Sequence, residues 1–566
     1  RRFRPMADDR TREVRARLRR VRARTEEATV APKATLRFAV YALVGVVVGA
    51  AVAAYQWLAL DLLLEHLLDA PLWVQAVAPG IGLVLTALAL RAGRTTPATS
   101  DEYVRAYHTG ADLAPRALVA KMAAAVATLG SGGAMGAEGP SVLVGAGIGQ
   151  RAGIRLRSVL GPRGHRSLAV AGAAAGVAAI FGAPATGVLF ALETPFQRDV
   201  ARRALIPALV AAAASYLTFV SIWGVHSYLP VPQGEVRLRD EVFGAVILGV
   251  CSGIAARGLA WAWSTSKDLA SRTPLGPRLL AATVVIGVVF AGARGLTGLS
   301  FTLGPGVERV AELASDPSTG LWVIAAAFAL RALATSAVLV AGGVGGLFIP
   351  LVVQGLLLGR LVEALFTDAA PGLYPVIGLA AVLGAGYRTP LAAVMFVAET
   401  TGQAQFVIPA LVATAVSQAV MGDESVAAYQ VNEREGLLER RLRRPVRDVL
   451  IRVPILHPDE PVLEVIDTHG ERPPAQALPV CDDGYRGLLF LRDLAGALFE
   501  HGPDATVADA MHDVAAVRVD VPAVEAARLM GELDSAVVAV VDEDGRALGV
   551  VTALTMTGAL DYDPDD

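Results

Sequence analysis

The chain has 566 residues, of which 54% are hydrophobic and only 18% are charged, and its mean hydropathy is +0.51. Soluble domains seldom combine this length with so positive a hydropathy, so the composition indicates a polytopic membrane protein. The net charge of −3 excludes little because the charges are segregated along the chain. The two cysteines, Cys251 and Cys481, exclude a disulfide framework, and no metal site or required cofactor is indicated.

The first 35 residues form a segment rich in arginine, without a cleavable signal pattern. The positive-inside rule places this segment in the cytoplasm, in contact with lipid rather than nucleic acid. Apolar stretches follow that are long enough to cross a hydrocarbon core of ~30 Å. The clearest of them are Phe38–Leu64, Leu72–Leu90, Val242–Trp263, Leu279–Ala293 and Leu321–Ala341. We therefore expect a membrane domain over residues 36–432.

Two constructions occur twice in this domain. Lys121–Pro140 and Arg331–Pro350 each run from a basic residue through an apolar helix into a glycine cluster that ends at proline. Ala183–Thr194 and Thr389–Thr400 each place a proline at the same distance before a Glu-Thr pair. Glycine-interrupted apolar segments in matched positions of two halves are typical of transporters with a site near the bilayer midplane. The sequence thus predicts two inverted repeats, over about 36–225 and 240–430.

The glycine clusters mark breaks in membrane helices. A lipid-exposed break would leave backbone groups unsatisfied, so both breaks must be buried in protein or line a watery cavity. Each is followed by a helix, and the free N–H groups and dipole of a helix N-terminus attract anions. Two such N-termini can converge into an anion site built from backbone. The alternative is that the glycines only permit close helix packing.

Glu138 lies inside the first break. A carboxylate at membrane depth is a functional candidate by default. When ionised it competes with an anion for the same amide donors, and when protonated it leaves them. Glu138 is therefore predicted to act as a gate and as a candidate proton carrier.

The composition changes at about Gly422. Residues 433–447 read as a charged linker, and residues 448–566 contain two short α/β units, over about 448–500 and 505–560. In the second unit, Ala536–Asp542 and Ala547–Val551 give a strand–turn–strand signal. This tandem arrangement resembles a pair of CBS domains, which bind adenine nucleotides in many proteins. Each site here keeps one half of the nucleotide pattern, Asp493 in the first unit and Thr552 in the second, so a structural or dimer-stabilising role is expected over nucleotide binding.

The membrane domain resembles the CLC chloride channels and transporters. GAEGP (Gly136–Pro140) is similar to the family's G-K/R-E-G-P motif, and GGLFIP (Gly345–Pro350) is similar to its GxFxP motif. The LFALE and VMFVAE segments match as well. The resemblance implies an all-α inverted-repeat fold with broken helices, a homodimer with one pore per subunit, and Glu138 as the gating glutamate. It also implies a plasma (inner) membrane protein that is not an enzyme, with both termini in the cytoplasm.

The resemblance further assigns backbone amides to two anion positions. Those of Leu347 and Phe348 would hold a central anion, and those around Ala137, Glu138 and Gly139 an outer one. Gly346 and Ile349 are further anion-binding candidates.

The chain departs from the family at four points. The GSGIP segment, which supplies a serine hydroxyl, is absent, and Thr99 or Ser100 is the candidate substitute. The basic position of the first motif is Ala137. The tyrosine that closes the inner side falls at Ala427, with Tyr429 two residues later. The inner proton-transfer glutamate is replaced by Thr194.

These departures predict chloride conductance that is uncoupled from protons or weakly coupled to them. The alternative within the family is a stoichiometric H+/Cl− antiporter. A CBS-regulated cation transporter would need more oxygen ligands along its path, and neither a membrane enzyme nor a sensor without transport explains the repeated breaks. The other matched charges, Glu193 with Glu399 and Lys121 with Arg331, are expected to cap, anchor or pair within the repeats.

Overall fold

The computed structural model describes residues 35–161, 164–224, 238–366, 372–433, 439, 442–469 and 475–557. The chain divides into two compact units, Arg1–Glu433 and Arg434–Asp566, which are treated separately below. The predicted basic segment lies outside the described residues except for Thr35, and so does part of the predicted linker.

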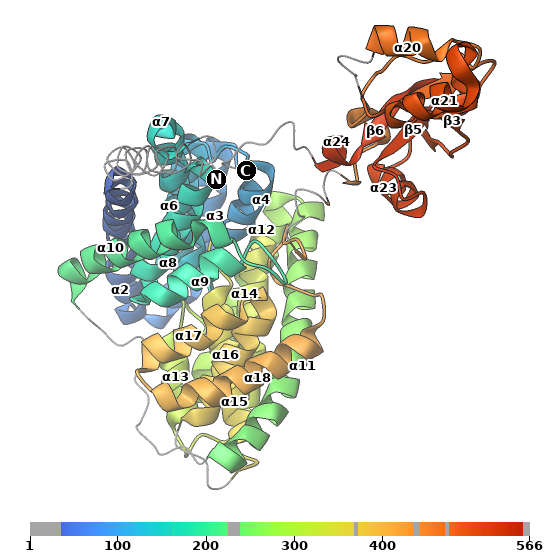
Figure 1. Ribbon diagram of the computed structural model, residues 1–566. Helices are drawn as coiled ribbons and strands as arrows, with labels where there is room; N and C mark the ends of the chain where they lie inside the picture. Colours follow the sequence, from blue (N-terminus) through green and yellow to red (C-terminus); the bar gives the residue numbers. More distant parts are fainter. Residues whose placement is uncertain are drawn as a thin grey trace, which may run out of the picture. The chain divides into compact units, whose positions relative to one another are not determined.

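The first unit consists of helices (Figure 1). Within the described ranges, eight helices are long and apolar enough to cross a membrane. They are Thr35–Asp69, Leu72–Gly93, Gly164–Phe181, Arg202–Trp223, Glu241–Arg272, Leu275–Thr297, Leu321–Ala341 and Ala404–Met421. The prediction of an all-α polytopic membrane domain is confirmed.

The helices of the first half begin with the one that includes η1 (Trp57–Leu64) and α2 (Glu65–Asp69). They continue as α3 (Leu72–Gly93), α4 (Ser100–Thr109), α5 (Pro115–Gly130), α6 (Glu138–Arg155), α7 (Arg157–Leu160), α8 (Gly164–Phe181), α9 (Pro184–Glu193), η2 (Arg202–Ala204) and α10 (Leu205–Trp223).

The second half repeats the order of long and short helices. It contains α11 (Leu238–Arg272), α12 (Leu275–Thr297), α13 (Val307–Ser315), α14 (Leu321–Ala341), α15 (Phe348–Glu363), α16 (Leu373–Tyr387), α17 (Pro390–Thr401), η3 (Ala404–Phe406) and α18 (Val407–Met421).

Glycines let the helix after each break approach the next helix closely. A Cβ at Gly145 of α6 would lie 2.1 Å from the carbonyl oxygen of Gly172 in α8. A Cβ at Gly355 of α15 would lie 2.4 Å from the carbonyl oxygen of Gly378 in α16. Real Cβ atoms do not tolerate such distances, so both halves use glycine for the same backbone contact. Close packing is therefore one role of the glycines, although it does not explain the breaks themselves.

The two breaks are buried and hydrogen-bond to each other. The N–H of Gly136 donates to the carbonyl of Gly346 at 2.9 Å, and the N–H of Gly346 donates back to Gly136 at 2.7 Å. Thr128 accepts the N–H of Val344 at 3.0 Å, and Thr335 donates to the carbonyl of Ala134 at 2.9 Å. Each half thus satisfies backbone groups that the other half leaves open, as burial in a membrane protein requires.

The second unit is a small α/β domain with two three-stranded sheets. The first contains β1 (Ala477–Cys481), β2 (Tyr485–Phe490) and β3 (Met511–His512), and the second contains β4 (Val517–Arg518), β5 (Val537–Val541) and β6 (Ala547–Thr552). β5 and β6 are antiparallel neighbours, which confirms the predicted strand–turn–strand unit.

Short helices surround these sheets. They are η4 (Val446–Asp448), α20 (Val462–His469), η5 (Leu491–Asp493), α21 (Leu494–His501), η6 (Gly502–Asp504), α22 (Val507–Ala510), α23 (Ala523–Glu532) and α24 (Ala553–Thr557).

Candidate functional site

The N-termini of α6 and α15 meet at a buried carboxylate. Glu138, the first residue of α6, is 0% exposed. Its Oε1 accepts the N–H of Phe348, the first residue of α15, at 2.7 Å, and the carboxylate also interacts with the amide of Ile349. A negative group therefore occupies the helix N-terminus where free N–H groups attract anions.

Glycine leaves room for this carboxylate. A Cβ at Gly136 would lie 1.9 Å from Glu138 Oε2, and a Cβ at Gly346 would lie 2.0 Å from Oε1. Neither residue has a positive φ that would itself demand glycine. The glycines beside Glu138 are thus explained by its side chain, which any larger residue would displace.

One of the predicted amides already has a hydrogen-bond partner. The N–H of Gly346, an anion-binding candidate, donates to the carbonyl of Gly136, so this amide is already used within the fold. The other candidate amides at the start of α15 are those of Leu347, Phe348 and Ile349. Ala137 is the N-cap residue of α6 and accepts the hydroxyl of Ser141 at 2.9 Å.

Tyr387, which sequence reasoning missed, supplies a hydroxyl at this site. The hydroxyl accepts the N–H of Leu347 at 3.3 Å, and the residue is 3% exposed. Tyr387 interacts electrostatically with Glu138 and with Asp101. The only available signal was a tyrosine at the end of an otherwise apolar run, directly before Arg388.

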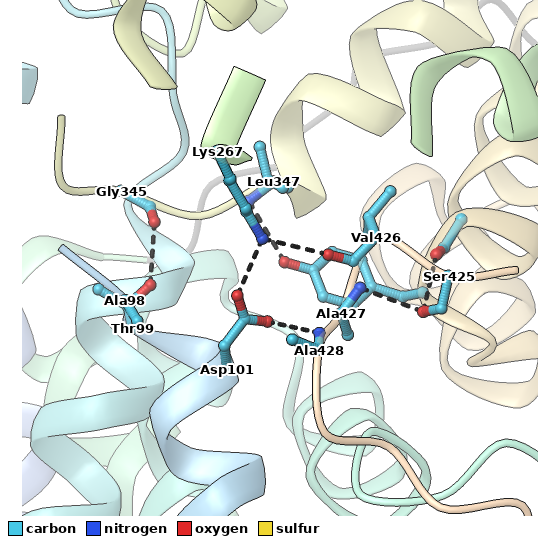
Figure 2. A network of polar contacts seen from close by, with 12 residues as sticks. Ala98, Thr99, Asp101, Lys267, Gly345, Leu347, Ser425, Val426, Ala427 and Ala428 are labelled. Carbon is cyan, nitrogen blue, oxygen red and sulfur yellow. Dashed lines mark hydrogen bonds and ion pairs between the residues drawn. The ribbon is translucent and has the colours of Figure 1, made fainter. Parts of the chain in front are cut away.

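The predicted inner tyrosine lies elsewhere. Tyr429 is 60% exposed and has a φ of +67°, so its ring does not reach the Leu347 amide. Ala427 is buried, and its N–H donates to the hydroxyl of Ser425 at 3.1 Å (Figure 2). Among the described residues, the tyrosine hydroxyl that accepts the Leu347 amide is that of Tyr387, at the end of α16.

The two candidate hydroxyls before α4 differ in their use. Thr99 Oγ1 donates to the carbonyl of Gly345 at 2.9 Å (Figure 2). Ser100 Oγ is buried and lies beside the side chain of Tyr387. Ser100 is therefore the candidate hydroxyl that accompanies Tyr387, whereas Thr99 holds the second break in place.

Aromatic rings enclose the Phe348 side of the site. The ring of Phe348 lies 4.8 Å from that of Phe181, 5.4 Å from Phe190 and 5.0 Å from Phe396, measured between centroids. All four are buried. Such a wall keeps water away and strengthens the electrostatic contacts within the site.

Tyr55 is a second buried polar residue near Glu138. Glu138 Oε2 and the hydroxyl of Tyr55 are both buried without a hydrogen-bond partner in the described part of the chain. The two residues interact electrostatically. Tyr55 lies on the first helix and is the second site residue that the sequence reasoning did not select.

Thr194, at the position of the inner proton-transfer glutamate, carries no titratable group. Its hydroxyl donates to the carbonyl of Phe190 at 2.5 Å. Its own carbonyl accepts the side-chain amide of Gln430 at 2.9 Å. The side chain is thus bonded within its own helix.

The matched glutamates cap each other's repeat. Glu193, at the end of α9, accepts the N–H groups of Leu391 at 3.1 Å and Ala392 at 2.8 Å, at the start of α17. Glu399, near the end of α17, accepts the N–H groups of Ala185 at 2.8 Å and Thr186 at 2.7 Å, at the start of α9. The capping expected from the sequence is observed in both directions.

The matched cations have different partners. Lys121 forms an ion pair with Glu102 and donates to the carbonyl of Ala98 at 2.6 Å. Arg331, fully buried, donates to three carbonyls, those of Phe301, Gly304 and Pro305. Neither cation contacts the amides at which Glu138 sits.

In the second unit, both candidate nucleotide residues have local partners. Asp493 lies 2.9 Å from His512 Nε2, and the hydroxyl of Thr552 accepts the N–H of Thr555 at 3.1 Å. Among the described residues no group of three or more His, Cys, Asp or Glu side chains could hold a metal ion.

Comparisons with known proteins agree with this geometry. Residues 91–422, more than half of the chain, match the family described as "Voltage gated chloride channel", and residues 505–561 match the CBS domain. A "chloride channel protein ClcB-like" of Ralstonia nicotianae is 27% identical over 61% of this chain and 81% of its own length. The "H(+)/Cl(-) exchange transporter ClcA" of Klebsiella pneumoniae is 28% identical over 52% of this chain and 64% of its own.

Two solved structures share the fold. One, described as a "CLC-type fluoride/proton antiporter", has a TM-score of 0.61 and 23% identity, over 70% of this chain and 98% of the other. The second, a "slow cyanobacterial Cl-/H+ antiporter", has a TM-score of 0.60 and 22% identity, over 68% and 94%. At these identities the likeness establishes the inverted-repeat fold with broken helices.

Proposed function

Because the chain belongs to the voltage-gated chloride channel (CLC) family, whose activity is anion transport, we propose that it moves chloride past Glu138. The observation that carries this proposal is the hydrogen bond from the Phe348 amide to Glu138 Oε1. A carboxylate and a chloride ion are both acceptors for the same N–H group, so only one of them can bind there. Glu138 is the gate because it must leave before the anion passes.

The anion is bound by uncharged donors. The N–H groups of Leu347 and Phe348 lie at the α15 N-terminus, and the hydroxyls of Tyr387 and Ser100 lie beside them. The Tyr387 hydroxyl accepts one N–H and still has its own proton to donate. Hydrogen bonds to a charged group contribute about 1.5–3 kcal/mol each, which is enough to hold an anion without trapping it behind a fixed cation.

We propose that transport is uncoupled from protons or weakly coupled to them. Glu138 offers one titratable group on the path, and Thr194 offers none at the second position that coupling uses in the family. A proton that reaches Glu138 from one side thus has no matched acceptor at Thr194. Stoichiometric H+/Cl− antiport is the second candidate, favoured by the buried Glu138 and by the exchange activity named for the Klebsiella relative.

The assembly follows from the family. We propose a homodimer in the inner membrane with both termini in the cytoplasm, in which the CBS pair stabilises the dimer without requiring an adenine nucleotide. Local pairing of Asp493 with His512 and of Thr552 with Thr555 supports this role. We also propose that the chain has no enzymatic activity.

The test is reconstitution of purified protein into chloride-loaded liposomes, with chloride efflux and internal pH followed together. Glu138→Gln keeps the size of the side chain and removes its charge, and Glu308→Gln on α13 is the control because Glu308 is exposed. We expect efflux without uphill proton movement, altered in rate by the Glu138 variant alone. Proton uptake against its gradient would support the antiporter. An efflux that Glu138→Gln leaves unchanged would overturn the gate.

A further inference from the structure

A partly exposed ion pair lies near Tyr387. Asp101, in the first turn of α4, places Oδ2 at 2.9 Å from the Nζ of Lys267, near the end of α11 (Figure 2). Asp101 Oδ1 accepts the N–H of Ala428 at 2.9 Å, and Lys267 donates to the carbonyl of Val426 at 3.3 Å. One carboxylate and one ammonium thus hold α4, α11 and the segment Ser425–Ala428 together.

This pair lies next to the proposed anion ligands. Asp101 follows Ser100 directly and interacts electrostatically with Tyr387. The segment it holds is attached beside the same tyrosine, because the N–H of Val426 donates to the carbonyl of Gly386 at 2.8 Å. An anion that leaves Tyr387 away from Glu138 therefore meets this cluster.

The charges are partly screened. The side chains of Asp101 and Lys267 are 16% and 37% exposed. The more exposed member is the cation, so a diffusing anion reaches Lys267 more readily than it reaches Asp101. Glu102, the nearest other carboxylate in sequence, is already paired with Lys121 and does not compete for Lys267.

We propose that Asp101 and Lys267 form an electrostatic latch at the end of the path opposite Glu138, in which Lys267 is the ligand for an entering halide. The anion takes the place of Asp101 on Lys267. Asp101 and Lys267 then lose their shared hold on Ser425–Ala428, and the way to Tyr387 opens. The inference rests on the proposed function. In it, a carboxylate competes with the anion at each end of the path, Glu138 at one end and Asp101 at the other.

The latch predicts opposite effects for its two members. Asp101→Asn removes the competitor and leaves Lys267 free, so the half-saturating chloride concentration at that face should fall. Lys267→Gln removes the ligand, so the same concentration should rise. Each shift should be about two- to fivefold, the range for a partly exposed ion pair. A purely structural clamp would be loosened by either change, which would shift both variants in the same direction.

The measurement is current across a planar bilayer with chloride varied on one face at a time. Asp268→Asn and Arg272→Gln form the matched control, since this exposed pair lies on the same helix α11 at 3.3 Å. Opposite shifts in the latch variants, on one face only, with unchanged controls would support the latch. Shifts in one direction, or none, would overturn it.

The double variant Asp101→Asn with Lys267→Gln tests which of the two residues binds the anion. Its half-saturating chloride concentration should equal that of Lys267→Gln, because the proposed ligand is absent from both proteins. If it resembled Asp101→Asn instead, Lys267 would not be the ligand. Glu138→Gln in the same bilayers separates the two proposals, because a rate that depends on Glu138 with no latch effect would refute the latch alone.

Discussion

The two repeats are symmetric where they support the fold and asymmetric at the proposed anion site. At α9 and α17, Glu193 and Glu399 each cap the other helix. At α6 and α15, the matched positions hold Glu138 and Phe348, 210 residues apart, and the first accepts the amide of the second. A second carboxylate at Phe348 would have no free amide partner and would repel the first. The repeat thus supplies two helix N-termini. Because only one of them carries a carboxylate, the amide of the other can donate either to that carboxylate or, as proposed, to an anion.

The same contrast separates the matched cations. Lys121 is neutralised by Glu102, whereas Arg331 is held by carbonyl oxygens alone. Each donates to a segment that follows an earlier helix of its own half, Lys121 to Ala98 after α3 and Arg331 to Phe301 after α12. Among the described residues neither cation is hydrogen-bonded to the break that holds Glu138, so the proposed anion site relies on backbone and hydroxyl donors there and on Lys267 at the other end of the proposed path.

The symmetric half of the comparison should give the largest effect. Glu399→Leu leaves two buried N–H groups and one hydroxyl of α9 without an acceptor, and Glu193→Leu leaves two N–H groups of α17. At about 1–3 kcal/mol for each unsatisfied donor, both variants should be destabilised by several kcal/mol, Glu399→Leu the more. Thermal unfolding in detergent would measure this, with Glu308→Leu as the exposed control. If only one of the two variants were destabilised, the two glutamates would not have equivalent capping roles.

At the two breaks, where the repeats are asymmetric, the matched glycines Gly136 and Gly346 should respond differently to substitution by alanine. The three nearest atoms to a Cβ at Gly136 all belong to Glu138, whereas a Cβ at Gly346 also meets the backbone N of Gly139 at 2.7 Å. Gly136→Ala should therefore expel only the flexible carboxylate and reproduce the efflux rate of Glu138→Gln. Gly346→Ala should lower expression and thermal stability as well. If Gly136→Ala kept the wild-type rate, the carboxylate would not be closing the path.

The sequence predicts the features that recur in the two repeats, but not the contacts between helices that are distant in the chain. The two glycine breaks, the helices that follow them and Glu138 can be found from the matched spacing alone. Tyr387 was missed because its hydroxyl reaches Leu347 across 40 residues. The sequence register leaves the role of Tyr429 open, because its exposure and its left-handed backbone are set by the fold. The pair of Asp101 and Lys267 spans 166 residues and leaves no local pattern.

The Tyr387 hydroxyl is expected to contribute to chloride affinity. Tyr387→Phe keeps the ring against Phe190 and removes one hydroxyl donor. A net hydrogen bond is worth about 1 kcal/mol, so chloride should bind about fivefold more weakly. Isothermal titration of detergent-solubilised protein would measure it, with Tyr429→Phe as the matched control. Equal affinities in the two variants would remove Tyr387 from the site.

The smallest effect is expected at the exposed helix cap of the C-terminal unit, in contrast to the buried glutamate caps. The N–H and the hydroxyl of Thr506 both donate to Asp509 Oδ2 at 2.9 Å, and these hydrogen bonds hold the pKa of Asp509 below its usual value. A carboxyl whose pKa is lower in the folded state stabilises above its unfolded pKa, and that contribution is lost as the pH falls through the folded pKa. The protection factors of the amides over Thr506–Ala510 in the full chain, corrected for the intrinsic exchange rate at each pH, should therefore fall in acid, and Thr506→Ala should show the lower protection already at neutral pH. Because the cap is exposed, the rest of the unit should keep its protection. Loss of protection across both sheets would mean that this cap bears on folding as the buried ones do.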